Sequence, residues 1–105
     1  MNRIEILKGF LEQEPKDSFS RYALALEYAK LGQQEDARRE FETVQLNDAG
    51  YVATYFQLGQ LYRTMGLKHD AEKILRSGIA VASKAGDAHT RDELAGALES
   101  LLSEG

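Results

Sequence analysis

The sequence predicts an all-α fold, an α-solenoid made of helix–turn–helix repeats, and two observations carry this prediction. Identical residues recur at a single offset of 34 residues: Leu24/Leu58, Tyr28/Tyr62, Gly32/Gly66, Asp36/Asp70 and Ala37/Ala71. A period of 34 residues is typical of a repeat built from two helices. The chain also has one proline in 105 residues and few runs of β-branched residues, a composition that favours helices over strands.

Apolar residues at helical spacing place the first three helices. The first covers residues 3–15 and is closed by Pro15. The second is capped by Asp17 or Ser18 and stops at Gly32, where glycine lets the chain turn. The third opens near Gln34 and ends at the turn-rich segment 47–50.

Three further helices complete the predicted chain. The fourth is expected over about 51–65 and stops at Gly66, and the fifth covers 68–84. Thr90 and Glu93 have the spacing of a capping box, which predicts the start of a sixth helix that runs to about 103. Glycines inside the predicted helices, at 9, 59, 78 and 96, are interpreted as sites of close helix packing.

Two short patterns connect these helices to a known family. Tyr55, Leu58, Gly59 and Tyr62 follow the spacing W-x-x-L-G-x-x-Y with one aromatic exchange, and Ala71 and Leu75 follow A-x-x-x-F. One period earlier, Arg21 stands where the large aromatic residue is expected, while Ala37 and Phe41 are retained. On these residues the chain resembles the tetratricopeptide repeat family. The alternative is an ordinary helical bundle with a coincidental spacing.

The resemblance implies a domain organisation and a binding surface. One right-handed solenoid domain over residues 1–105 would hold a half-unit helix (3–15), two repeats (18–51 and 52–85) and a capping helix (87–104). In this family the first helices of the repeats line a concave groove. The residues that the resemblance assigns to the groove are Phe19, Tyr22, Leu26, Lys30, Phe56, Gln60 and Arg63. Aromatic and leucine side chains favour docking over solvation; the alternative is that the last helix covers this surface.

One branch of the family binds acidic tails of cytosolic chaperones through a clamp of Lys and Asn side chains. Tyr22 and Leu26 stand at two of the clamp positions, so the resemblance does not extend to that clamp. Lys30 and Arg63 remain as candidate anchors for a carboxylate or a phosphate.

Composition argues against several other functions. The net charge of −4 and the lack of a basic stripe argue against a nucleic-acid partner. The absence of cysteine removes thiolate chemistry and suits a reducing, cytoplasmic setting. No apolar run approaches the roughly 18 residues of a membrane span. His69 and His89 are 20 residues apart and share no face with a second ligand, so no metal or other cofactor is expected.

The sequence therefore predicts a non-catalytic module that binds a partner protein or peptide in the groove. A self-associating structural homodimer is the alternative, in which grooves or end helices of two copies cover each other. No nucleophile with a base, acid/base pair or phosphate loop supports an enzyme.

Overall fold

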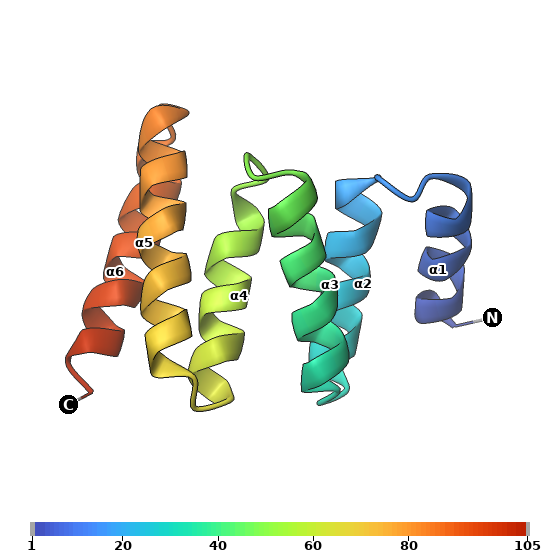
Figure 1. Cartoon of the computed structure of the whole chain (residues 1–105), viewed down its shortest axis with the longest axis horizontal. Coiled ribbons are helices and arrows are strands. Elements are labelled where there is room, and N and C mark those ends of the chain that lie inside the picture. Colours follow the sequence, from blue (N-terminus) through green and yellow to red (C-terminus); the bar gives the residue numbers. More distant parts are fainter. Residues whose placement is uncertain (1, 105) are drawn as a thin grey trace. The chain divides into compact units, whose positions relative to one another are not determined.

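The computed structural model describes residues 2–104, and within them it contains six helices and no strand (Figure 1). The helices are α1 (Arg3–Gln13), α2 (Ser18–Lys30), α3 (Gln34–Asn47), α4 (Ala53–Thr64), α5 (Lys68–Lys84) and α6 (Ala88–Leu102). The chain divides after Tyr51 into two compact units. The first unit holds α1, α2 and α3, and the second unit holds α4, α5 and α6. The all-α prediction is confirmed.

Two helix ends differ from the prediction for local reasons. α1 ends at Gln13 rather than at residue 15, because Glu14 precedes Pro15 and has a non-helical conformation, with φ −131° and ψ 78°. α4 begins at Ala53, two residues later than expected. The N–H of Tyr51 donates to the carbonyl of Asp48 at 2.9 Å, which keeps Tyr51 in the turn before the helix.

Three glycines turn the chain at the ends of α2, α4 and α5. Gly32, Gly66 and Gly86 have φ values of +74°, +78° and +73°, a region that side chains disfavour. After α2, the N–H of Gly32 donates to Ala29 and the N–H of Gln33 to Tyr28, at 3.1 and 3.0 Å. The same pair of bonds recurs at the other two ends, and it forms the Schellman motif that closes a helix.

The start of α6 corrects the predicted capping box. Asp87, not Thr90, is the N-cap, because its carboxylate Oδ1 accepts from the N–H of Thr90 at 3.0 Å. Aspartate is among the strongest N-cap residues, and its position after the Gly86 turn lets the helix begin at once. Thr90 therefore lies in the first turn, and α6 starts two residues before it.

In the first unit, α2 contacts both α1 and α3. Its core contains Leu7, Ala23, Leu24, Ala25, Tyr28, Ala37, Phe41 and Val44. Arg21, which replaces the expected aromatic, pairs with Glu40 of α3 at 2.7 Å. The guanidinium also donates to the carbonyl of Pro15 at 2.9 Å, which ties the loop between α1 and α2 to the same side chain.

In the second unit, α5 contacts α4 and α6, and α4 also contacts α6. A Cβ added to Gly59 would lie 2.5 Å from a methyl of Leu75, and one added to Gly78 would lie 2.6 Å from the Cβ of Tyr55. Close packing is confirmed at these two glycines. The prediction of close packing is wrong for Gly9 and Gly96, where an added Cβ would meet no atom within 4 Å.

Candidate partner-binding site

The first unit carries four of the predicted groove residues on α2. Phe19, Tyr22, Leu26 and Lys30 follow the spacing i, i+3, i+7 and i+11, which places them along one side of the helix. Phe19 is 65% exposed, Lys30 is exposed, and Leu26 is half-buried. The other sides of α2 supply the core residues Leu24, Ala25 and Tyr28, so the predicted side is more exposed at Phe19 and Lys30 than the rest of the helix.

Tyr22 differs from the expectation that it lies outside the core. Its ring centroid is 5.8 Å from that of Phe41, which is 1% exposed, and 5.4 Å from that of Tyr51. Sequence reasoning missed Tyr51 as a neighbour, although an aromatic residue directly after the turn at 47–50 was a usable signal. Burial, followed by the charges of Asp17 and Asp48, raises the pKa of Tyr51. Tyr22 is thus partly a structural residue.

The second unit carries the other three predicted residues on α4. Phe56, Gln60 and Arg63 are each partly buried, and Phe56 packs against the core of this unit. Arg63 forms an ion pair with Glu104, which follows α6. Because α6 also contacts α4, the last helix covers part of the side that the resemblance assigned to a partner.

Both predicted anchors for an anionic group already have carboxylate partners. The ammonium of Lys30 lies 3.1 Å from Oε2 of Glu27, and the same oxygen lies 3.3 Å from Nε of Arg3. Arg63 is paired with Glu104. A ligand carboxylate would have to displace these groups, which lowers the electrostatic gain from binding it.

The described residues give no sign of a metal centre or a membrane span. Within residues 2–104, no three side chains of the His, Asp and Glu type come together as ligands, and His69 and His89 are both exposed. No helix in this part of the chain has the length and apolar character needed to cross a bilayer.

Comparisons with known proteins bear on the repeat architecture. The family model for the tetratricopeptide repeat matches residues 52–84. A tetratricopeptide repeat domain protein from Salinibacter ruber, solved in solution, is 37% identical over 83% of this chain and 88% of that chain, with a TM-score of 0.79. No curated protein matches the sequence.

Two further solved structures share the fold at low identity. The TPR2B domain of yeast Sti1, solved as a complex with pHsp70, is 13% identical over 97% of this chain and 82% of that chain, with a TM-score of 0.90. The type III secretion translocator chaperone SycD from Yersinia enterocolitica is 15% identical over 96% and 70%, with a TM-score of 0.87. These two matches show the shared fold. The Salinibacter relative and the family model confirm the resemblance seen in the sequence: the chain belongs to the tetratricopeptide repeat family.

Proposed function

We propose that this protein is a non-catalytic interaction module in which exposed side chains of α2 bind an apolar segment of a partner protein. Tetratricopeptide repeat domains are generally non-catalytic interaction modules. The similar Sti1 domain was solved with a bound partner, and SycD is a chaperone, so two proteins of this fold act on other proteins. A single-domain organisation and a cytoplasmic location stay predictions.

The exposure of Phe19 carries the proposal. A phenylalanine with 65% of its surface in water, on the same side of α2 as Leu26, contributes little to the stability of the isolated chain. Aromatic side chains of this kind supply large contact area at low entropic cost when a partner covers them. They are frequent among the few residues that dominate binding energy. Phe19 is therefore a better proposed anchor than Tyr22, whose ring is already packed.

The proposed recognition is apolar rather than anionic. Lys30 and Arg63 are paired with Glu27 and Glu104, so an anionic ligand would compete with a carboxylate already present at each cation. A complex that depends on apolar contacts responds weakly to salt, whereas one held by exposed ion pairs weakens as salt rises. Binding should consequently change little between low and high ionic strength.

A capture experiment with matched variants tests this proposal. Immobilised wild type, Phe19→Ser and Leu46→Ser are compared for the proteins that each retains from extract of the native host. Leu46 is the control, because it is 79% exposed on α3, outside the proposed side of α2. Phe19→Ser should lose about 2–4 kcal/mol of binding with an unchanged unfolding midpoint. Equal retention by all three proteins would place the docking surface elsewhere.

A further inference from the structure

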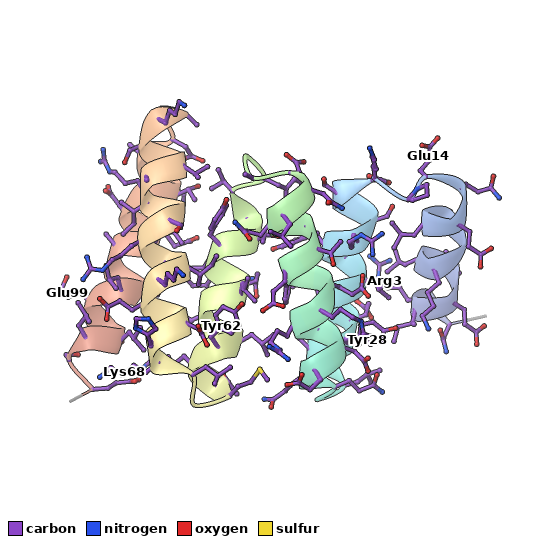
Figure 2. The ribbon with its side chains drawn as sticks, in the orientation of Figure 1. Arg3, Glu14, Tyr28, Tyr62, Lys68 and Glu99 are labelled. Carbon is purple, nitrogen blue, oxygen red and sulfur yellow. The ribbon has the colours of Figure 1, made fainter. Side chains whose placement is uncertain are left out.

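α1 exposes an apolar stripe that the proposed partner-binding residues do not include. Ile6 is 40% exposed and Phe10 is 55% exposed. Arg3 and Gln13 extend the stripe at the spacing i, i+3, i+7 and i+10, so the four side chains follow one side of the helix. Arg3 and Glu14 lie at opposite ends of α1 (Figure 2).

The 34-residue register shows what the same positions do in the other helices. Phe10 corresponds to Val44 of α3, which is 1% exposed, and to Gly78 of α5, which is buried. At Gly78 the approach is so close that an added Cβ would lie 2.6 Å from the Cβ of Tyr55 on α4. The position that α1 exposes is therefore one that α5 uses to pack against another helix.

Ile6 has equivalents of the same kind. It corresponds to Glu40, whose carboxylate pairs with Arg21 of α2 at 2.7 Å, and to Ile74, which packs against the core of the second unit. In α3 and α5 this side thus receives the preceding helix of the same repeat. By register, the exposed stripe of α1 is a helix-accepting surface.

We propose that this stripe binds the same stripe of a second copy, with the two α1 helices antiparallel about a twofold axis near residue 8. The stripe is self-complementary in that orientation. Ile6 meets Phe10 of the other copy, and Arg3 approaches Gln13 and Glu14 of the other copy. Glu14 has no ion pair within the described residues. Arg3 lies 3.3 Å from Glu27 of α2, but its side chain is 62% exposed. An exposed pair of this kind contributes little to stability, so Arg3 can exchange Glu27 for Glu14 of the other copy at little cost. Antiparallel helices also oppose their macrodipoles favourably.

The size of the surface determines how stable such a dimer is. One helix from each copy covers less than the roughly 800 Å² per partner of a standard stable interface. The dimer is therefore reversible and concentration-dependent. A closed twofold pair uses up both stripes, so association stops at two copies instead of extending into a filament.

Disulfide trapping tests the proposed orientation, because the chain has no cysteine of its own. The variants Arg3→Cys and Gln13→Cys are oxidised separately and as a mixture, and the products are weighed by mass spectrometry. Ten residues of helix separate the two positions by about 15 Å, whereas a disulfide joins Cα atoms within about 7 Å. Antiparallel pairing therefore predicts the mixed disulfide in the mixture, with each variant alone at the background level of Leu46→Cys.

Other occupants give other products. Parallel pairing of α1 would link each variant to itself, and that result overturns the proposed orientation. Pairing of α1 with α6 of another copy, or a stripe that binds only a foreign peptide, would give no product above background and would overturn the proposal.

Sedimentation measurements test the dimer independently of cysteine chemistry. Phe10→Gln should raise the dimer dissociation constant by more than about tenfold, since a symmetric interface contains the substitution twice. The matched variant Leu46→Gln, also an exposed apolar residue, should leave the constant unchanged. A wild type that stays monomeric up to about 1 mM, the weak end of specific association, overturns the proposal. Phe19→Ser leaves α1 intact, so failure of partner capture and failure of dimerisation are separable.

Discussion

Gly78→Ala is expected to destabilise the protein, although alanine is the better helix former. Gly78 lies in the interior of α5, where alanine would gain about 1 kcal/mol from helix propensity. Against this, the added Cβ would lie 2.6 Å from the Cβ of Tyr55 and 3.1 Å from a methyl of Leu94. The first of these atoms is fixed to the backbone of α4, so it moves only if the helix moves.

The magnitude follows from the competition between these two effects. Adding a methyl group to a well-packed core costs about 1–3 kcal/mol. The upper part of that range applies, because Tyr55 is 1% and Leu94 is 0% exposed and neither side chain has free space. Subtracting the propensity gain of about 1 kcal/mol leaves a net loss of about 2 kcal/mol in the free energy of unfolding.

Gly96→Ala is the matched control for this prediction. Gly96 also lies inside a helix of the second unit, but an added Cβ there meets no atom within 4 Å. Only the higher helix propensity of alanine affects this variant, so its free energy of unfolding should rise by up to about 1 kcal/mol. Urea unfolding followed by circular dichroism measures both changes. If both variants gain stability equally, the close approach of α5 to α4 at Gly78 is wrong.

Two other predictions concern the ion pair of the first unit and the cap of α6. Arg21→Met should cost about 2 kcal/mol of unfolding free energy, because it leaves the largely buried Glu40 with only the longer 3.8 Å contact to Arg39. The double variant Arg21→Tyr/Glu40→Ile installs the residue types that the second unit has at the equivalent positions. Its free energy of unfolding in urea should return to that of the wild type. A double variant as unstable as Arg21→Met would contradict this reasoning. Hydrogen bonds from the side chain and backbone of Thr90 lower the pKa of Asp87, so its stabilisation is complete above about pH 4 and is lost as pH falls through the lowered pKa. Asp87→Asn should flatten this acid loss of helicity in circular dichroism, and an unchanged acid profile would exclude Asp87 as its source.

The repeat period made the turns and the close contacts predictable. Gly32 and Gly66 adopt positive φ because a Schellman turn needs that conformation, and a recurring glycine signals it. Gly59 was recognisable because its position in the first helix of a repeat requires a small residue. The sequence did not distinguish Gly9 and Gly96 from Gly59. A glycine inside a predicted helix does not by itself indicate whether another helix packs against it, and none does at Gly9 or Gly96.

The predicted site was harder to judge because exposure depends on neighbours outside the helix that carries the residue. The resemblance assigned Tyr22 to the groove side of α2, but its contact with Tyr51 depends on the path of the chain through the turn at 47–50. The partner of Arg63 follows α6, far away in the sequence. Neither contact produces a periodic pattern in the sequence, so neither could be predicted from the sequence alone.

The differences between equivalent positions are more informative about function than their similarities. Phe10, Val44 and Gly78 share one register position, yet the first is exposed, the second is buried, and the third allows another helix to approach its backbone. The smallest of the three, Gly78, stands where an added Cβ would lie 2.6 Å from the Cβ of Tyr55, as expected for a position that faces a closely packed helix. A phenylalanine at this position is therefore compatible with helix contact only at a wider spacing. In the proposed pairing of two α1 stripes, Phe10 opposite Ile6 would require that wider spacing, within the 8–10 Å usual for packed helices.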